Sequence, residues 1–253
     1  MGGEDANAGF RLTWLGHATV LIELDGVRVL TDPVLRRRLA HLERAEAVAD
    51  AALPPLDLVL ISHVHYDHLD RPSLRRLGER AARVAVPVGA APLVRGTGVG
   101  EVVELGEGDQ LEVGTLRVRA TYAEHRASRH PLAPELPCLG FVVEGSRRVY
   151  FAGDTDLFDG MDDLAGGLDV ALLPVAGWGP RLPPGHLDPA GAAEAARRLR
   201  PRVAIPIHWG TLKPLYRRTH YSGDAAEQFG AHVREVAPDV EVRVLGVGES
   251  CTF

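Results

Sequence analysis

Residues 58–70 read LVLISHVHYDHLD, a run of four apolar residues and a serine that leads directly into three histidines and two aspartates. The apolar run predicts a buried β-strand. Because side chains alternate along an extended chain, His63 and His65 point to the same side if the extended backbone continues past the strand. Asp67 and His68 follow where the chain begins to turn, so they can face a second point beside the first.

This density of ligand-type side chains is hard to explain by packing. Buried imidazoles and carboxyls must be hydrogen-bonded or bound to a metal, and these groups adjoin a buried strand. A lone histidine here would usually be structural, whereas the cluster as a whole predicts a metal site.

Three later segments repeat the pattern of an apolar strand that ends in a potential ligand: LRVRATYAEH, VYFAGD and VAIPIH. Each is weak alone, because a histidine after a strand is more often a surface or core residue and an aspartate after glycine commonly forms a turn. Together they complete two sites joined by a bridging carboxylate. The expected ligands are His63, His65 and His125 for the first site, Asp67, His68 and His208 for the second, and Asp154 for the bridge.

Nitrogen and carboxylate ligands without a thiolate suit Zn²⁺, while Mn²⁺ and Fe remain alternatives. Such cations lower the pKa of a bound water from about 15.7 to about 7, so that hydroxide forms at neutral pH. The sequence therefore predicts a hydrolase with two divalent metal ions, in which a metal-bridging hydroxide cleaves a small ester, lactone or phosphodiester.

The motif HVHYDH, with the later histidine, aspartate and histidine, resembles the HxHxDH signature of the metallo-β-lactamase superfamily. The segments WLGHATVLIELDGVRVLTDPV, LISHVHYDHLD, FAGDT, HLDP and IPIHWGT look like the N-acyl-phosphatidylethanolamine-hydrolysing phospholipase D branch and the neighbouring ascorbate-phosphate lactonase-like proteins. The resemblance spans Arg11 to about Lys213. It implies the metal roles above and an α/β fold of the αββα type.

The resemblance also implies roles for residues outside the ligand set. Asp32 in TDP would accept a hydrogen bond from a ligand histidine and orient it, although a turn with Pro33 is an equal alternative. His186 in PPGHLDP joins Asp67 as a catalytic candidate that binds substrate or protonates the leaving group, and a hydrogen bond at the helix entry is its alternative. His17 in LGHAT is expected at the rim of the site.

The aromatic and remaining histidine residues have simpler interpretations. Trp178 and Trp209 flank the predicted site and could form a substrate wall, but core packing is the favoured reading. Four histidines lie in polar or helical surroundings and are expected on the surface: His41, His130, His220 and His232.

Apolar, β-branched segments predict strands, and helices are indicated between them. The expected strands are Arg11–Leu15, Thr19–Leu24, Val27–Thr31, Leu56–Ile61, Val84–Val86, Leu116–Thr121, Gly140–Glu144, Val149–Ala152, Val170–Pro174, Val203–Ile207 and Val240–Leu245. The expected helices are 189–200 behind Asp188, Pro72–Arg83, Asp224–Val236 and Arg36–Ala51. Early and late strands with helices between them favour two sheets packed face to face with helices outside.

The chain as a whole has an ordinary globular composition, with 253 residues and a formal charge of −6. Such a charge argues against nucleic acid or an anionic membrane as a partner, despite the basic run at residues 36–38. We expect a disordered leader at residues 1–9, one domain over residues 10–253, a small-molecule substrate and a cytoplasmic location, with homo-oligomerisation left open. Cys138 and Cys251 lack metal-binding spacing and are expected to be free thiols.

Comparison with the wider superfamily narrows the activity. The best-known β-lactamases have a cysteine where this chain has Asp154, which argues against antibiotic hydrolysis. RNA-processing relatives carry a large insertion between the positions of Asp154 and His208, which argues against a nuclease. Lipid-cleaving relatives carry an N-terminal extension, so phospholipid cleavage is suggested by the family resemblance only. Two alternatives remain. A di-iron redox or gas-binding module usually has a carboxylate at the position where this chain has His65. A non-catalytic regulator would be expected to lose metal ligands, and none of the expected ligands is lost here.

Overall fold

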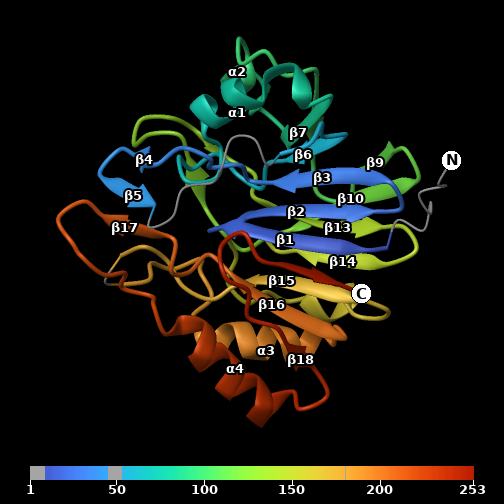
Figure 1. The fold of residues 1–253 in the computed structure, drawn as a ribbon, viewed down its shortest axis with the longest axis vertical. Helices are drawn as coiled ribbons and strands as arrows, with labels where there is room; N and C mark the ends of the chain where they lie inside the picture. Colours follow the sequence, from blue (N-terminus) through green and yellow to red (C-terminus); the bar gives the residue numbers. More distant parts are fainter. Residues whose placement is uncertain (1–8, 45–52, 180) are drawn as a thin grey trace, which may run out of the picture.

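The computed structural model describes residues 9–44, 53–179 and 181–253. Two seven-stranded sheets face each other, with strand orders β19-β1-β2-β3-β6-β7-β8 and β18-β16-β15-β14-β13-β10-β9 (Figure 1). The first contains β1 (Arg11–Gly16), β2 (Thr19–Leu24), β3 (Val27–Thr31), β6 (Leu58–Leu60), β7 (Arg83–Pro87), β8 (Glu101–Leu105) and β19 (Ser250–Thr252). The second contains β9 (Gln110–Val113), β10 (Leu116–Tyr122), β13 (Leu139–Glu144), β14 (Arg148–Phe151), β15 (Val170–Pro174), β16 (Val203–Ile207) and β18 (Glu241–Val242).

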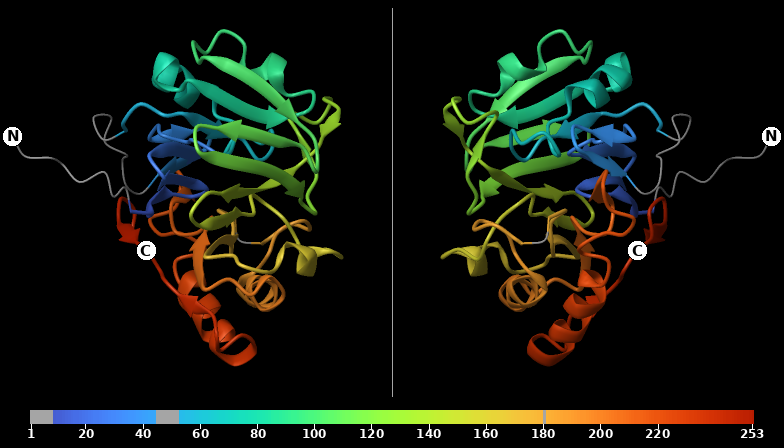
Figure 2. Two further views of the ribbon diagram at one scale, coloured as in Figure 1. Left: turned by 90° about the vertical axis from the view of Figure 1, so that its right-hand side faces the viewer. Right: turned by 90° about the vertical axis from the view of Figure 1, so that its left-hand side faces the viewer.

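Helices cover the outer face of each sheet, on opposite sides of the molecule (Figure 2). The helices are α1 (Arg71–Leu77), α2 (Ala91–Val94), α3 (Pro189–Leu199) and α4 (Ala225–Val236), with 3-10 turns η2 (Gly78–Arg80) and η3 (Met161–Leu164). Leu74 of α1 lies in one buried cluster with Val84 of the first sheet, and Phe229 of α4 lies in another with Ala171 of the second. The expected αββα sandwich is confirmed.

Strand β6 shows why the deciding segment is apolar without alternation. Leu58 and Leu60 enter the core between the sheets, whereas Val59 and Ile61 enter the core under α1 and α2. A strand buried on both faces reads as a continuous apolar run. The run therefore ends where the chain leaves the core between the sheets, and the polar residues begin there.

The helix expected over residues 36–51 is wrong in its described part, which forms β4 (Arg38–Leu39) and β5 (Leu42–Arg44); residues 45–51 lie outside the described chain. Strand β5 pairs with β17 (Leu212–Pro214), and Leu39 and Leu42 pack with Leu212. Ala40, at a left-handed φ of +50°, closes the turn between the two strands. Leucines with helical spacing thus pack onto a distant segment, and tertiary pairing overrides the local pattern.

Further differences from expectation concern element ends and sheet edges. Helix α1 stops at Leu77 because Gly78, at φ +52°, starts a 3-10 turn, so the helix is shorter than the predicted Pro72–Arg83. Strands β8, β9 and β19 were not expected, and β18 is shorter than Val240–Leu245. All four are terminal strands of their sheets. An edge strand needs fewer apolar residues than an inner one, which explains the weak sequence signal.

Other predictions concern termini, thiols and membranes. Of the predicted leader, only Gly9 lies in the described chain, and it is exposed. Cys138 and Cys251 are both free, as expected. Within the described residues, no helix combines the length and the apolar character that a bilayer crossing requires. Two short strands, β11 (Ala127–Ser128) and β12 (Glu135–Leu136), form a separate hairpin.

The start of α3 generates a stability prediction. Asp188 Oδ1 accepts a hydrogen bond from Gly191 N at 2.7 Å, so Asp188→Ala should lower the free energy of unfolding by about 1 kcal/mol. Asp224 precedes α4 without capping it through its side chain, which makes Asp224→Ala the matched control with a smaller loss. Urea unfolding would compare the two variants, and equal losses would contradict the capping role.

Candidate metal centre

The chemistry-bearing side chains gather where several strands end. His63 and His65 follow β6, Asp154 follows β14, and His208 follows β16. Strands β14, β15 and β16 run parallel, and the antiparallel pairs β10–β13 and β13–β14 give β10 the same direction. His125, behind β10, therefore reaches the same edge. Carboxyl ends of strands thus bring distant segments together, as is usual for ligand sites in α/β proteins.

The first group comprises His63, His65 and His125. His65 Nδ1 lies 3.0 Å from His63 Nε2 and 3.2 Å from His125 Nε2. His125 Nδ1 is 2.8 Å from the carbonyl oxygen of Gly185, which can only accept, so this nitrogen carries the proton and Nε2 keeps its lone pair. His63 Nδ1 likewise donates to Ser62 Oγ, 2.9 Å away. The unprotonated Nε2 atoms of His63 and His125 therefore both face Nδ1 of His65.

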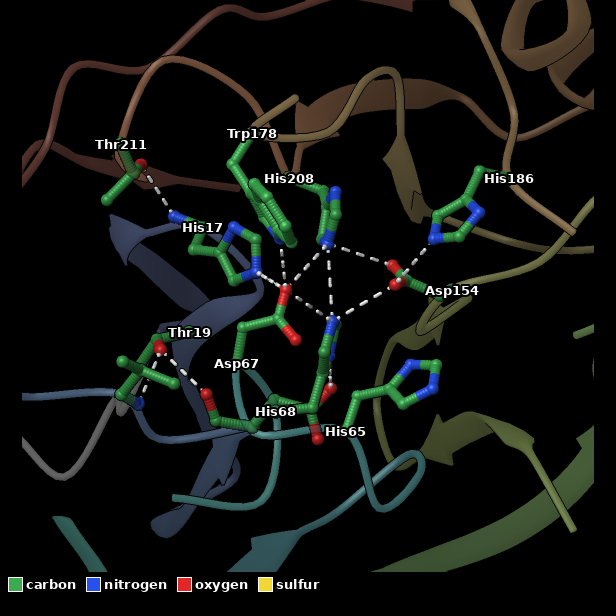
Figure 3. Close-up of polar contacts among 12 residues, drawn as sticks. His17, Thr19, His65, Asp67, His68, Asp154, Trp178, His186, His208 and Thr211 are labelled. Carbon is green, nitrogen blue, oxygen red and sulfur yellow. Dashed lines mark hydrogen bonds and ion pairs between the residues drawn. The ribbon is translucent and has the colours of Figure 1, made fainter. Parts of the chain in front are cut away.

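The second group contains His68 and His208, whose Nε2 atoms are 3.2 Å apart (Figure 3). Asp67 Oδ2 lies 3.9 Å from each of them. Asp154 stands between the groups, because its Oδ2 is 3.1 Å from His68 Nε2 and 3.8 Å from His63 Nε2, and its Oδ1 is 3.2 Å from His208 Nε2. All seven predicted ligands thus converge in one place.

One oxygen of Asp154 tests whether this arrangement fits a metal. His208 Nδ1 donates to the carbonyl oxygen of Ala176 at 2.6 Å, so its Nε2 is an acceptor. The 3.2 Å contact with Asp154 Oδ1 consequently joins two acceptors, and this buried oxygen has no hydrogen-bond donor among the described residues. Such an oxygen is costly to bury unless a cation compensates it. The donor set, imidazole nitrogens and carboxylate oxygens, fits divalent cations.

Asp32 is linked by hydrogen bonds to both groups, directly to His68 and through Ser62 to His63. It is fully buried, its Oδ2 is 2.7 Å from His68 Nδ1, and its Oδ1 accepts from Ser62 N at 2.7 Å. The same Oδ2 accepts the hydroxyl proton of Ser62, whose Oγ in turn accepts from His63. Sequence reasoning missed Ser62, whose only signal is a small polar residue directly before the first histidine of the motif.

Charge and burial set the protonation of these groups. Burial lowers the pKa of His63 well below its usual value and that of His125 to about 4, so both are neutral at pH 7. Burial opposes ionisation of Asp154, but the imidazoles around it hold its pKa well below the usual range. Burial also opposes protonation of His68, yet Asp154 and Asp32 raise its pKa well above normal. A cation at the second group must therefore displace a proton.

The position expected for His17 is wrong. It lies not at the rim but buried at the second group, with 2% of its surface exposed and Nε2 3.2 Å from Asp67 Oδ2. Burial lowers the pKa of its imidazole to about 3. Its φ of +55° belongs to the tight turn between β1 and β2, which directs the ring inward. The sequence signal was a glycine–histidine pair between two apolar strands.

A cavity of about 530 Å³ opens beside the cluster. Its walls are largely apolar, and side chains of both groups reach it. The wall includes Leu39, Leu42, Tyr66, Trp178, Leu182 and Pro183, and the cluster contributes His65, Asp67, Asp154, His186 and His208. Its size and apolar lining are typical of small-molecule sites.

His186 and Trp178 both take part in this cavity. His186 Nε2 is 3.5 Å from Asp154 Oδ2, and its Nδ1 lies 3.1 Å from the carbonyl oxygen of Pro183. Burial opposes its protonation, but the contact with Asp154 raises its pKa above the usual value. Trp178 lines the cavity and also donates from Nε1 to Asp67 Oδ2 at 3.1 Å, so it does more than pack.

The other singled-out aromatic and histidine residues lie outside the cluster. Trp209 stacks on Trp14 with ring centroids 5.3 Å apart, which is the expected packing role. His41 is exposed but touches Trp178 edge-on at the cavity wall. His130 is exposed, and His220 and His232 are half-buried.

Comparisons with known proteins agree with this geometry. Residues 27–209 match the sequence profile described as "Beta-lactamase superfamily domain". A UPF0173 metal-dependent hydrolase of Methanopyrus kandleri is 37% identical over 249 residues, covering 95% of this chain and 98% of that protein. N-acyl-phosphatidylethanolamine-hydrolyzing phospholipase D 1 of Caenorhabditis elegans is 32% identical over 237 residues, covering 81% of this chain but only 65% of its own length.

A solved structure shows the same architecture over the whole chain. Igni18, a metallo hydrolase of Ignicoccus hospitalis, superposes with a TM-score of 0.75 at 25% identity, over 96% of this chain and 98% of its own. The profile match begins at β3 and ends one residue after His208, so it spans every element that positions the seven convergent side chains. This chain therefore belongs to the metallo-β-lactamase superfamily.

Proposed function

We propose that this protein is a dinuclear metal-dependent hydrolase that cleaves a small ester, lactone or phosphodiester. The observation that carries the proposal is the donorless Oδ1 of Asp154, buried between two groups of imidazoles at the base of a cavity. His63, His65 and His125 would hold one cation and Asp67, His68 and His208 the other, with Asp154 shared. Zn²⁺ is the favoured metal because the ligand set contains nitrogen and carboxylate but no thiolate.

A bound pair of divalent cations supplies hydroxide at neutral pH and stabilises negative charge on a substrate oxygen. Side chains of the protein would carry out the proton transfers. The carboxylate of Asp67 lines the cavity beside His68 and His208, where it could accept the proton of the attacking water. His186, beside Asp154 and facing the cavity, is placed to protonate the leaving group or to bind the substrate.

The cavity wall seats the rest of the substrate. Tyr66, Trp178 and Leu182 would contact its apolar part and exclude bulk water from the reacting bond. The phospholipase name of the Caenorhabditis elegans relative favours phosphodiesters among the candidate substrates. A panel of lactones, phosphodiesters, phosphomonoesters and thioesters, assayed with Zn²⁺ and with Mn²⁺, would identify the class.

Metal content tests the proposal most directly. Protein purified without added metal should hold close to two divalent ions per chain, and Asp154→Ala should lower both metal content and hydrolysis, the latter by roughly 100-fold or more. Asp169→Ala is the matched control, because this carboxylate pairs with Arg147 at the opposite end of β15. Full activity of Asp154→Ala would contradict the proposal. Iron as the resident metal, seen as an absorption band, would favour the redox alternative.

His186 is tested through the leaving group. His186→Ala should keep its metals and lose about 100-fold in kcat on substrates with poor leaving groups, but much less on nitrophenyl substrates, whose leaving group needs no proton. The exposed His130 provides the control substitution His130→Ala. An equal loss on all leaving groups would indicate substrate binding in place of proton transfer.

Gly185 is expected to be essential for the first group. It has a φ of +84°, and an added Cβ would lie 2.9 Å from His125 Nδ1, so Gly185→Ala should displace this imidazole. We expect metal affinity to fall about 10–100-fold, as when other partners that orient a ligand are lost. Gly26→Ala carries similar backbone strain, at φ +80°, but meets only open space. If Gly185→Ala and Gly26→Ala both lose stability and neither loses metal affinity, the close approach of Gly185 to His125 has no role in the site.

A further inference from the structure

The carboxylate of Asp67 is held at one oxygen by two donors that belong to neither predicted metal-binding group. Its Oδ2 lies 3.2 Å from His17 Nε2 and 3.1 Å from Trp178 Nε1 (Figure 3). An indole nitrogen can only donate, so the contact with Trp178 is a hydrogen bond to the carboxylate. The oxygen that these two donors hold is therefore also the one that faces the second group, 3.9 Å from the Nε2 atoms of His68 and His208.

His17 is itself immobilised through its backbone. Its N–H donates to Thr211 Oγ1 at 2.7 Å, and its carbonyl oxygen accepts from Trp14 Nε1 at 2.9 Å and from His208 N at 2.9 Å. The residue sits in a left-handed turn, so its side chain has little freedom to leave. His17 thus touches Asp67 with its ring and His208 with its main chain.

Trp178 approaches Asp67 from the cavity. Its ring packs against a small apolar cluster formed around the three-stranded sheet, and it lines the cavity wall. The members of that cluster are Val34, Leu39, Leu42 and Leu212. The indole N–H consequently comes from a segment that is anchored independently of the β1–β2 turn.

We propose that His17 and Trp178 are positioning residues that hold Asp67 by Oδ2 and so fix the rotation of its carboxylate toward the second metal-binding group. Two donors from separate segments restrict that rotation more than either could alone. The inference rests on the proposed function, because Asp67 is assigned there to the second cation. Partners that orient a metal ligand typically contribute about 10–100-fold to metal affinity or activity.

A direct ligand role for His17 is the competing explanation. One ligand atom from each of His17, Asp67, His68 and His208 lies within 4.8 Å of the others, so all four could in principle bind one ion. Glutamine distinguishes the two roles. Its amide nitrogen is separated from Cα by the same number of bonds as His Nε2 and can donate to Asp67, but it is a poor ligand for zinc.

The experiment measures affinity for the second cation by competition with a chromophoric chelator, together with the visible spectrum of the cobalt-substituted protein. We expect Trp178→Phe and His17→Phe to weaken binding of the second cation by about 10–100-fold with little change for the first, and His17→Gln to restore most of the loss. Trp209→Phe is the matched control, since it removes an indole hydrogen bond to the carbonyl oxygen of Pro206. The His17→Phe variant should also lower kcat more than it changes KM.

Wild-type affinity for the second cation in both Trp178→Phe and His17→Phe would overturn the proposal. Equal losses in His17→Gln and His17→Phe would overturn it as well, because they would make His17 a ligand. If His17→Phe does not fold, Trp178→Phe still decides, since it keeps an aromatic ring at a half-buried position. A wild-type protein that binds two cations but hydrolyses nothing would contradict the proposed function alone, because metal affinity is measured without substrate.

Discussion

The buried carboxylate of Asp32 is the contact on which the arrangement of the site depends. It accepts hydrogen bonds from His68 Nδ1 and from both the backbone and the hydroxyl of Ser62. The hydroxyl oxygen of Ser62 in turn accepts a hydrogen bond from His63 Nδ1 and so orients that ring. One charge therefore fixes which nitrogen faces the centre in one histidine of each group, His63 and His68. Its place at the end of β3, parallel to β6, brings it beneath the histidine motif. Without that contact, the imidazoles would be free to turn their lone pairs away.

The segment between β15 and α3 orients the site from above and also forms much of the cavity. Its carbonyl oxygens and side chains contact a member of the site at four points. These contacts are Ala176 O to His208, Trp178 Nε1 to Asp67, Gly185 O to His125 and His186 Nε2 to Asp154. Substrate contacts and metal geometry thus share one loop, which is the usual location of specificity on a rigid scaffold.

Much of this site could be predicted from local sequence. The run from Leu58 to Ile61 is apolar at every position because this strand is buried on both faces, and ligand-type residues just after such a strand have few packing explanations. The same reasoning located His125, Asp154 and His208, and the structure brings them together. The capped start of α3 was equally local, since an aspartate before proline specifies a helix N-terminus.

The sequence by itself thus determined the inner strands, the sandwich and the seven convergent side chains, because these follow from burial and periodicity within short segments. Only the tertiary structure decided that residues 38–44 pair as strands with β17, that His17 is buried against Asp67, and that Ser62 and Trp178 serve the site. Each of these depends on a contact between segments far apart in the chain. A local pattern carries no record of which distant donor or strand will fill the space beside it, so such contacts emerge only once the two sheets have packed.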